Sequence, residues 1–290
     1  MNRTIPIAAA PGSAAALQST RPAQPSADFD QRVQDALAML RVAAQEFAGR
    51  IVQATSLGAE DMVMTDLIAR HALPIAIATL DTGMLHDETL DLLGRAQQHY
   101  GLEIEIWRPN AVAALDFVAR HGLQAMYTSV DLRHACCALR KLEPLSRMLQ
   151  GRAAWITGLR HEQSSTRGLT SLRETDAQGR VKLCPLLDWT QGDVWHYIAL
   201  HAVPYNTLHD QCFPSIGCAP CTRAVTLGED IRAGRWWWEQ EGAKECGLHV
   251  GQRPAALDPR DGPHGVAADA VATEPIATQP IATEPSGAHA

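Results

Sequence analysis

The chain has 290 residues, of which 46% are hydrophobic and 20% charged, so it is long enough to bury a substantial core. Its formal net charge of -7 argues against a general electrostatic attraction to nucleic acid or to anionic membranes. No stretch approaches the roughly 18 apolar residues that span a bilayer, and Pro6, Pro11 and Gly12 interrupt the Ala-rich start, so we expect neither a membrane helix nor a secretory signal.

Both ends of the chain lack the periodicity of packed elements. Residues 1–27 are rich in Ala, Pro, Ser and Gln, and residues 254–290 contain a near-repeat of Thr-Glu-Pro-Ile-Ala. Such compositions do not bury enough apolar surface to fold. We therefore expect a disordered N-terminal extension over residues 1–27, one folded domain over 28–253 and a disordered tail over 254–290.

Between these ends, short apolar runs alternate with longer amphipathic segments. The runs and segments are Phe29–Ala48, Ile51–Ala54, Glu60–His71, Pro74–Leu80, Leu102–Trp107 and Ala153–Thr157. Strands alternating with helices of this length predict an α/β fold in which helices cover both faces of a parallel sheet. Ligands of such folds bind beyond the carboxyl ends of the strands, so the loops that follow the apolar runs are the first candidates for a site.

Three of these loops carry polar residues suited to a ligand. In the first, from Thr55 to Asp61, hydroxyls and Gly58 lie just ahead of a helix, where backbone N–H groups can bind a phosphate; a cap and a turn explain the same residues. The second reads Leu80-Asp-Thr-Gly83, and the third reads Thr157-Gly-Leu-Arg-His-Glu-Gln-Ser164. Turn chemistry also explains these two, whereas their shared position at strand ends favours a nucleoside site with an arginine that meets an anion.

A further helix start is predicted at Thr190. Thr190 and Asp193 have the spacing of an N-cap and its acidic partner, and Trp195 and Ile198 then fall on one apolar face. We interpret this segment as structural.

The seven cysteines form an adjacent pair, a Cys-x-x-Cys and three singletons. They are Cys136 with Cys137, Cys218 with Cys221, and Cys184, Cys212 and Cys246. This odd count and spacing predict reduced thiols and metal ligands, and therefore a cytoplasmic protein, rather than a disulfide framework. A Cys-x-x-Cys leaves zinc, iron–sulfur and dithiol redox chemistry open. The adjacent pair fits a small tetrahedral ion poorly, because neighbouring side chains diverge, and fits a larger cluster with separate irons more easily.

Two other features of the cysteine pattern have alternative readings. Lys141 follows Cys137 by four residues, so in a helix its ammonium lies on the same face as that thiolate, although a solvated lysine fits the spacing as well. Cys184 and Cys212 have no partner spacing, and we expect each to be a buried thiol.

Cys246 is the candidate nucleophile. It lies between Lys244 and His249, and basic groups near a thiol lower its pKa and favour the thiolate. Upstream, Arg232 and Arg235 precede three consecutive tryptophans, and on a helix their guanidinium groups would lie on one side. Paired arginines favour an anionic electrophile, although arginines beside tryptophans also form stacked surfaces.

Six motifs over about residues 50–249 resemble those of the assimilatory sulfonucleotide reductases, and within them the iron–sulfur type of adenylyl-sulfate (APS) reductase. In order, the motifs are Ser56-Leu-Gly-Ala-Glu-Asp61, Leu80-Asp-Thr-Gly83, Cys136-Cys-Ala-Leu-Arg-Lys-Leu-Glu-Pro-Leu145, Thr157-Gly-Leu-Arg-His-Glu-Gln-Ser164, Tyr205-Asn through Pro214-Ser-Ile-Gly-Cys-Ala-Pro-Cys-Thr-Arg223, and Glu245-Cys-Gly-Leu-His249. The resemblance implies an adenine-nucleotide alpha-hydrolase-like, Rossmann-like α/β fold with a parallel sheet.

The resemblance also implies a cofactor and a reaction. A 4Fe-4S cluster would be held by the four paired cysteines, Cys136, Cys137, Cys218 and Cys221. Cys246 would attack the sulfur of APS, release AMP and become an S-sulfocysteine, from which thioredoxin or glutaredoxin would free sulfite for sulfate assimilation and cysteine biosynthesis. Members that lack the cluster cysteines typically use the 3′-phosphorylated nucleotide PAPS, so the resemblance favours APS here.

The same resemblance assigns the substrate contacts. The implied substrate-binding residues are Ser56, Gly58, Asp61, Leu80, Thr82, Gly83, Lys141, Arg160, Arg232, Arg235 and His249. The last five of these would meet the sulfate group, and Lys141 would also link the cluster electrostatically to the substrate. The prediction includes no nucleic acid and no membrane among the partners, and it admits a homo-oligomer.

Two departures from the family pattern stand out. Cys212 occupies a position where the family commonly has glycine, and the chain continues well past His249, where family chains usually stop. Two other readings remain open. An ATP-pyrophosphatase-like enzyme such as a tRNA-thiolating enzyme would share the fold, but a Ser-Gly-Gly phosphate loop and a basic RNA face are absent from the sequence. A metal-stabilised binding module would leave the motif around Cys246 unexplained.

Overall fold

The computed structural model describes residues 24–163 and 171–239. Its strands are β1 (Ile51–Thr55), β2 (Ala76–Leu80), β3 (Glu105–Trp107), β4 (Ala154–Ile156), β5 (Arg173–Thr175) and β6 (Val181–Leu183). Its α-helices are α2 (Phe29–Glu46), α3 (Ala59–Arg70), α4 (Asp87–Tyr100), α5 (Ala111–His121), α6 (Val130–Cys137), α7 (Glu143–Met148) and α8 (Gln191–His201). One π-helical turn, η2 (Ala138–Leu142), joins α6 to α7, and 3₁₀ turns lie at η1 (Ala125–Tyr127), η3 (His161–Gln163), η5 (Thr207–Gln211) and η6 (Ala219–Cys221).

The strands form one six-stranded sheet in the order β3-β2-β1-β4-β6-β5. All neighbouring pairs are parallel except β5 with β6. The predicted α/β fold is therefore confirmed, and each of the four predicted strands overlaps an observed one. The sequence reading did not include β5 and β6, whose three residues each are too few to show a periodic pattern.

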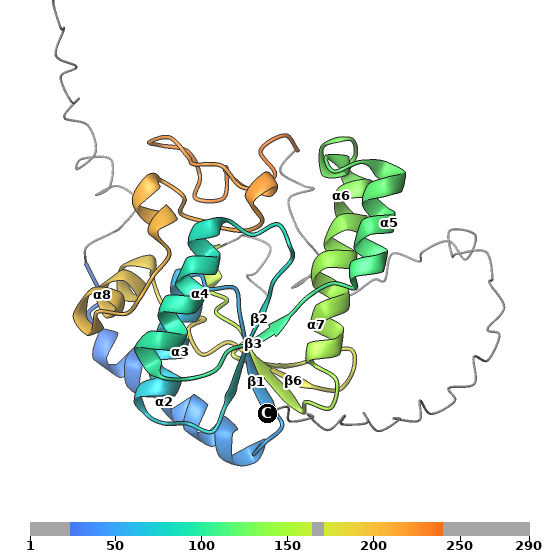
Figure 1. The fold of residues 1–290 in the computed structure, drawn as a ribbon. Helices are drawn as coiled ribbons and strands as arrows, with labels where there is room; N and C mark the ends of the chain where they lie inside the picture. Colours follow the sequence, from blue (N-terminus) through green and yellow to red (C-terminus); the bar gives the residue numbers. More distant parts are fainter. Residues whose placement is uncertain (1–23, 164–170, 240–290) are drawn as a thin grey trace, which may run out of the picture. The chain divides into compact units, whose positions relative to one another are not determined.

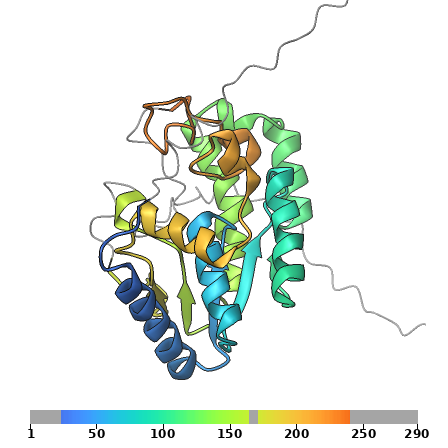
Figure 2. The same cartoon turned by 90° about the vertical axis from the view of Figure 1, so that its left-hand side faces the viewer.

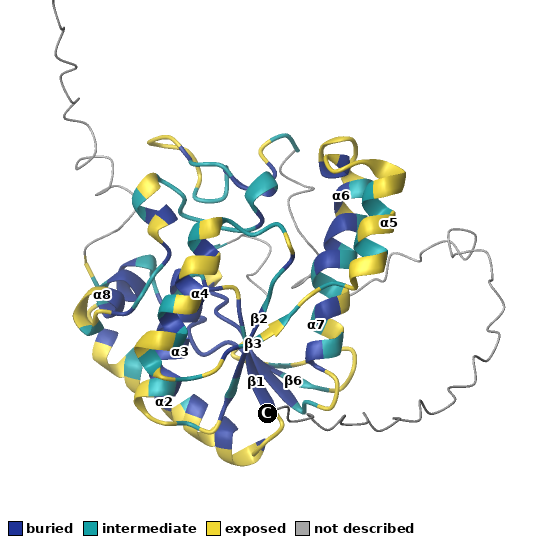
Figure 3. Cartoon of the chain, in the orientation of Figure 1, coloured by how far each residue is buried: buried dark blue, intermediate teal, exposed yellow. Residues whose placement is uncertain are grey.

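Helices lie on both faces of the sheet (Figure 1). On one face, α2, α3, α4 and α8 pack into a core with alternate residues of the strands, among them Ile51. On the other face, Met148 and Leu149 at the end of α7 pack against Val52 and Trp155. Adjacent residues Ile51 and Val52 thus point into different cores, as the period of two in a strand requires. The central strands β1 and β4 are buried between the layers, whereas β3 at one edge of the sheet is partly exposed (Figure 3).

Helix α3 is fixed to β1 by a buried polar network. The Gln53 side chain on β1 donates to the backbone carbonyl of Asp61 at 2.7 Å, and the Thr65 hydroxyl donates to the Gln53 side-chain oxygen at 3.2 Å. All three residues are buried, and each hydrogen bond satisfies a group that would otherwise be costly to desolvate. The network sets the position of the first turn of α3 relative to the end of β1.

Helix α8 begins with the predicted capping box. The Asp193 N–H donates to the Thr190 hydroxyl at 3.0 Å, and the Thr190 N–H donates to the Asp193 carboxylate at 2.8 Å. Asp193 also accepts from the backbone and the hydroxyl of Ser26, both at 2.7 Å, which attaches the residues before α2 to the start of α8. Phe29 of α2 then packs edge-on against His196 of α8, with ring centroids 4.9 Å apart. Figure 2 shows the blue ribbon of α2 next to the gold ribbon of α8.

The run from α6 through η2 to α7 passes beside the strand ends, and α5 lies next to it (Figure 1). No residue of α5 is buried, and Val112 and Leu115 are 76% and 71% exposed. Across the described residues, no helix combines the length and the apolar character needed to cross a membrane.

Candidate active site

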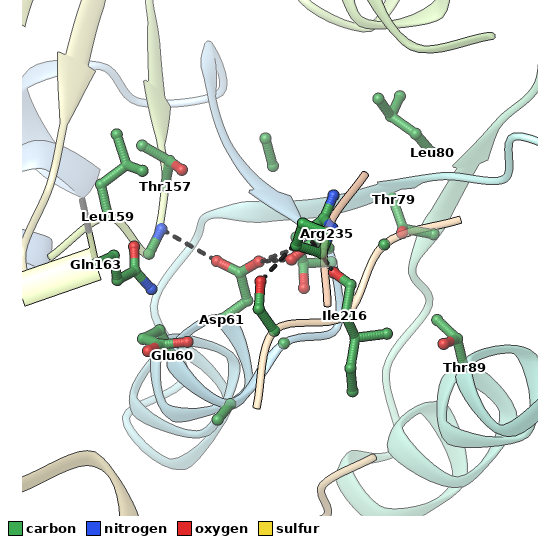
Figure 4. A pocket seen from close by; sticks show the side chains of 18 of the residues that line it. Glu60, Asp61, Thr79, Leu80, Thr89, Thr157, Leu159, Gln163, Ile216 and Arg235 are labelled. Carbon is green, nitrogen blue, oxygen red and sulfur yellow. Dashed lines mark hydrogen bonds between the residues drawn. The ribbon is translucent and has the colours of Figure 1, made fainter. Parts of the chain in front are cut away.

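A cavity of about 250 Å³ lies where the strand order reverses (Figure 4). β1 and β4 are neighbours in the sheet although β2 and β3 lie between them in the chain. Open α/β sheets bind ligands at such a switch point, beyond the carboxyl ends of the strands. The cavity walls accordingly include the loops that follow β1, β2 and β4.

Most of the predicted substrate-binding residues meet at this cavity. Those that line it are Ser56, Gly58, Asp61, Leu80, Thr82, Lys141, Arg160, Arg232 and Arg235. Gly83 does not line it; with a φ of 69° it turns the chain after β2, and its N–H donates to the Asp81 carboxylate at 2.9 Å. His249, like the predicted nucleophile Cys246, lies outside the described residues.

Asp61 bridges the two loops at the switch point. Its carboxylate accepts hydrogen bonds from the Ser56 N–H at 2.6 Å, the Ser56 hydroxyl at 2.7 Å and the Gly158 N–H at 3.0 Å. Burial raises the pKa of Asp61 to about 6, and the nearby Glu60 carboxylate adds to this, while the bonds from Ser56 and Gly158 oppose it. The donors expected to hold a phosphate in the first loop are thus used by a carboxylate of the protein.

Gly158 is the residue that makes this bridge possible. A Cβ at this position would lie 2.5 Å from Asp61 Oδ1, 2.9 Å from Glu60 Cβ and 3.2 Å from the Asp61 backbone nitrogen. The first two separations are shorter than real Cβ contacts, so a larger residue would push the start of α3 away from β4. Gly158 in the Thr-Gly pair after β4 therefore allows this loop to approach the start of α3 closely, in addition to turning the chain.

Arg160 is buried, at 2% exposed, and is shared by two carboxylates. Its guanidinium donates to Glu60 at 2.9 Å and to Glu162 at 2.9 Å, and also to the Trp189 carbonyl at 3.2 Å. The arginine that the sequence assigned to the sulfate group thus lines the cavity as part of an ion-pair network. Glu60 also lines the cavity, whereas Glu162 does not.

The loop after β2 connects the cavity to the cysteines. The Thr82 hydroxyl lies 3.3 Å from Cys218 Sγ, and the Met84 N–H donates to the same hydroxyl at 3.2 Å. The Thr82 carbonyl accepts from the buried Arg140 guanidinium at 2.8 Å. Thr82 is itself 2% exposed, so it forms part of the wall between the two regions.

The four paired cysteines line a second, smaller pocket. Cys136, Cys137, Cys218 and Cys221 share its wall, and each is between 6% and 8% exposed. None of the six cysteines in the described ranges is in a disulfide. Within the same ranges, no group of three or more His, Cys, Asp or Glu side chains is placed to hold one metal ion.

The surroundings of these thiols differ. Burial would raise the pKa of the Cys218 thiol, but the Lys141 ammonium, the Thr82 hydroxyl and Arg235 outweigh it and lower the pKa. Burial raises the pKa of Cys221 to about 12, and the neighbouring thiols of Cys218 and Cys137 add to the effect. Lys141 and Arg235, which line the cavity, therefore also place positive charge near Cys218.

Lys141 reaches both regions, by a route that the sequence did not predict. Cys136 and Cys137 end α6, and the residues that follow them form the π-helical turn η2, in which hydrogen bonds join residues five apart. The expected α-helical turn from Cys137 to Lys141 is therefore not formed. Lys141 nevertheless lines both the cavity and the cysteine pocket, as do Cys218 and Trp236.

The segment that carries Arg232 and Arg235 is not helical, contrary to the spacing argument. Arg235 instead forms an isolated antiparallel bridge with Thr222, and its guanidinium donates to the Ile216 carbonyl at 3.2 Å. Trp236 lies between two guanidinium groups, with those of Arg133 and Arg235 at 4.8 and 4.7 Å from its ring centroid. Both predicted arginines still line the cavity.

Several residues of the site were missed or assigned differently from the sequence. Trp195 and Gln191 of the segment interpreted as structural also line the cavity, together with Glu60 and His209. Trp195 is both a core residue and a cavity wall, so its place on an apolar face was right but incomplete. The order of the strands in the sheet would have indicated these residues, because α8 follows β6, and β6 pairs with β4 at the switch point.

Cys184 and Cys212 lie outside the cysteine pocket. Cys184 is fully buried, as predicted, whereas Cys212 is only partly buried, so the prediction for it was wrong. Cys212 ends η5 with a φ of 65°, a left-handed conformation that favours glycine and turns the chain there. Glycine would adopt this conformation with less strain than cysteine does.

Comparison with known proteins gives a consistent result. Residues 50–224 match the phosphoadenosine phosphosulfate reductase domain. An adenosine 5′-phosphosulfate reductase of Allochromatium vinosum is 59% identical over 200 residues, which cover 69% of this chain and 78% of that protein. A protein of the same name from Burkholderia cepacia is 52% identical over 198 residues, covering 68% of this chain and 79% of that protein.

The fold comparison agrees. The crystal structure of phosphoadenylyl-sulfate (PAPS) reductase from Candida auris in a phosphate complex is 28% identical and has a TM-score of 0.56. The match covers 67% of this chain and 96% of that one. With the switch-point cavity and the ordered motifs around it, these matches show that the chain belongs to the phosphoadenosine phosphosulfate reductase family.

Proposed function

We propose that this protein reduces APS to sulfite and AMP with electrons from thioredoxin, through an S-sulfocysteine on Cys246. The observation that supports this most directly is the shared wall of Lys141, Cys218 and Trp236 between the switch-point cavity and the cysteine pocket. Relatives named adenosine 5′-phosphosulfate reductase support APS as the substrate.

The four cysteines of the pocket are proposed to hold a 4Fe-4S cluster. Four thiols at one pocket supply one ligand for each iron, a donor set typical of such clusters. Two N–H donors on the pocket wall, Arg140 Nε and Trp236 Nε1, are buried without a hydrogen-bond partner among the described residues, and sulfide would be an acceptor for them. When bound, the cluster would supply negative charge and structural support beside the substrate rather than electrons.

The cationic residues of the cavity would bind the phosphosulfate. A thiolate that approaches an anionic sulfo group is repelled, and Lys141, Arg232 and Arg235 would screen this repulsion and stabilise the departing phosphate. His249 is proposed to join them. Arg160 would contribute less positive charge to binding the phosphosulfate, because its guanidinium is already paired with the carboxylates of Glu60 and Glu162.

The proposed reaction has two steps that balance. The Cys246 thiolate attacks the sulfur of APS, so an S–S bond forms, the S–O bond to the 5′-phosphate breaks, and AMP leaves with that electron pair. A thioredoxin thiolate then attacks Cys246 Sγ, so that a mixed disulfide forms and sulfite leaves with the electrons of the old S–S bond. The second thioredoxin thiolate attacks the thioredoxin sulfur of that mixed disulfide, closes the thioredoxin disulfide and releases the Cys246 thiolate. Glutaredoxin is the alternative dithiol.

The remaining proposals concern context. Residues 28–253 would form the catalytic domain, flanked by the extension at 1–27 and the tail at 254–290. Six cysteines without disulfides within the described ranges support a reducing cytoplasm as the site of action. Self-association into a homo-oligomer would be compatible with this reaction.

The test is anaerobic sulfite release from APS and, separately, from PAPS with reduced thioredoxin, on protein assayed for iron and acid-labile sulfide. We expect about four irons per chain, the content of a single cubane, a strong preference for APS, and no sulfite from the Cys246→Ser variant. Zinc in place of iron would contradict the cluster, and full activity of Cys246→Ser would contradict the intermediate. Absence of sulfite from both nucleotides would contradict the reductase assignment itself.

A further inference from the structure

The last residue that the structure describes before Cys246 is held by a buried ion pair. Arg133 of α6 donates from Nε and Nη2 to the two carboxylate oxygens of Glu239, at 2.9 and 2.6 Å. Their side chains are 0% and 3% exposed. Two parallel bonds between a guanidinium and a carboxylate fix orientation as well as distance. Glu239 is therefore fixed in position and in direction, seven residues before the proposed nucleophile.

The same guanidinium connects this ion pair to both pockets of the site. Arg133 lines the cysteine pocket and lies over the ring of Trp236, 4.8 Å from its centroid. Trp236 lines both the cysteine pocket and the cavity, and its N–H donates to the Cys221 carbonyl at 3.2 Å. The Glu239 N–H in turn donates to the Trp236 carbonyl at 2.9 Å. We call Arg133, Trp236 and Glu239 the anchor.

Stability alone does not explain a buried ion pair at this place. Moving a guanidinium and a carboxylate out of water costs free energy, and apolar side chains of similar volume often stabilise a fold as well or better. The ion pair adds a defined geometry, because its two parallel bonds form in only one arrangement. The other attachment nearby is more exposed, since Trp238 packs on Tyr127, which is 40% exposed, with ring centroids 4.5 Å apart. The position of Glu239 therefore depends mainly on the anchor.

The length of the chain makes the position of Glu239 important for the reaction. Seven residues span at most about 25 Å when fully extended, so Cys246 can attack only a sulfur within that distance of Glu239. If the ion pair is lost, the last fixed residue is Trp236, and the connection lengthens from seven residues to ten. Length alone would lower the effective concentration of the thiol less than about twofold. The larger loss is conformational entropy, because residues 237–239 must be ordered again at each attack.

We propose that Arg133 and Glu239 are positioning residues, which hold the start of the segment that carries Cys246 so that its thiol meets the sulfo group in the cavity. This inference rests on the proposed function for the identity of the nucleophile. Neither Arg133 nor Glu239 lines the cavity, so neither contacts the nucleotide there. Breaking the ion pair should therefore slow the transfer of the sulfo group to Cys246 without weakening the binding of the nucleotide.

The experiment measures the single-turnover rate of Cys246 sulfonation at saturating APS, on the anaerobic full-length protein without a reductant, by rapid quenching and mass spectrometry. Calorimetry gives the AMP affinity of the same preparations, whose iron content is also assayed. The test variant is Glu239→Gln, which removes the carboxylate charge from the ion pair. The control is Asp66→Asn, which removes a buried carboxylate that is bonded to Arg70 and lies outside the cavity lining. Circular dichroism establishes that each variant is folded.

We expect Glu239→Gln to lower the sulfonation rate at least about tenfold, because the segment must be ordered at each attack. Its AMP affinity and iron content should stay within about twofold of the wild type, a separation of rate from binding that a merely structural role would not produce. Asp66→Asn should keep the wild-type rate. If Glu239→Gln does not fold, Arg133→Lys decides the question, because lysine keeps the positive charge but not the two parallel bonds, and its rate should also fall.

Two results would overturn the inference: a wild-type sulfonation rate in the deciding variant, or a rate that falls only together with the AMP affinity or the iron content. In both cases, sulfonation of Cys246 in the wild type would leave the proposed function intact. Failure of the proposed function has a different signature. A wild type that forms no adduct on Cys246 would remove the proposed intermediate and this inference with it.

Discussion

Replacing Gly158 by alanine should separate the loops at the switch point. The added Cβ would lie 2.5 Å from Asp61 Oδ1 and 2.9 Å from Glu60 Cβ, so the first turn of α3 must move. Overpacking of this kind costs about 2 kcal/mol, and loss of the hydrogen bond from the Gly158 N–H to a charged acceptor costs about 1.5 kcal/mol. We therefore expect the free energy of unfolding to fall by about 3.5 kcal/mol and the affinity for AMP to fall with it.

Urea unfolding at neutral pH measures this change as a lower midpoint with an unchanged slope. The matched control is Gly94→Ala in α4, where an added Cβ meets nothing within 4 Å. That substitution should raise stability by up to about 1 kcal/mol, because alanine favours a helix more than glycine does. A Gly158→Ala protein as stable as the wild type would mean that the close approach of Gly158 to Asp61 does not hold the two loops together.

Three further predictions concern stability and are read from the same urea titrations. Because burial raises the pKa of Asp61 from 3.8 to about 6, the folded state binds this proton more tightly than the unfolded state. The free energy of unfolding should therefore fall by up to about 3 kcal/mol as the pH rises from 4 to above 6. The Asp61→Asn variant should lack this pH dependence. If the variant keeps it, Asp61 is not the group that titrates. The buried Arg133 guanidinium lies 2.6 Å from the Glu239 carboxylate, and Glu239→Gln removes this counter-charge. The substitution should lower the free energy of unfolding by about 3 kcal/mol, and a loss below about 1 kcal/mol would contradict the burial of that pair. Thr190→Ala removes the hydroxyl that accepts from the Asp193 N–H and should cost about 1 kcal/mol, whereas an unchanged midpoint would mean that the cap contributes nothing.

The parts of the fold that depend on local pattern were predictable. The run at 153–157 contains β4, and Thr190 caps α8 as its spacing indicated. Apolar runs and caps act over a few neighbouring residues, so one sequence suffices to find them. The pairing of β4 with β1 creates the switch point and depends on contacts between segments about 100 residues apart. The sequence predicted a parallel sheet but not this strand order.

The family resemblance named nine residues that line the cavity, but it did not give their contacts. Asp61 was assigned to the substrate, yet its hydrogen bonds go to Ser56 and Gly158, because the two loops meet only in the folded sheet. Lys141 reaches the cavity through a π-helical turn that residue spacing does not reveal. Burial and ion pairing are tertiary properties, so Arg160 between its carboxylates could not be seen in the sequence.

The central claim is that Cys246 takes the sulfo group from APS. Mass spectrometry of the protein mixed anaerobically with APS, without a reductant, tests this most directly. We expect one sulfonate per chain, located on the peptide that contains Cys246, formed together with AMP and removed as sulfite when reduced thioredoxin is added. Sulfite release without any adduct on Cys246, or an adduct that persists in the presence of thioredoxin, would contradict it.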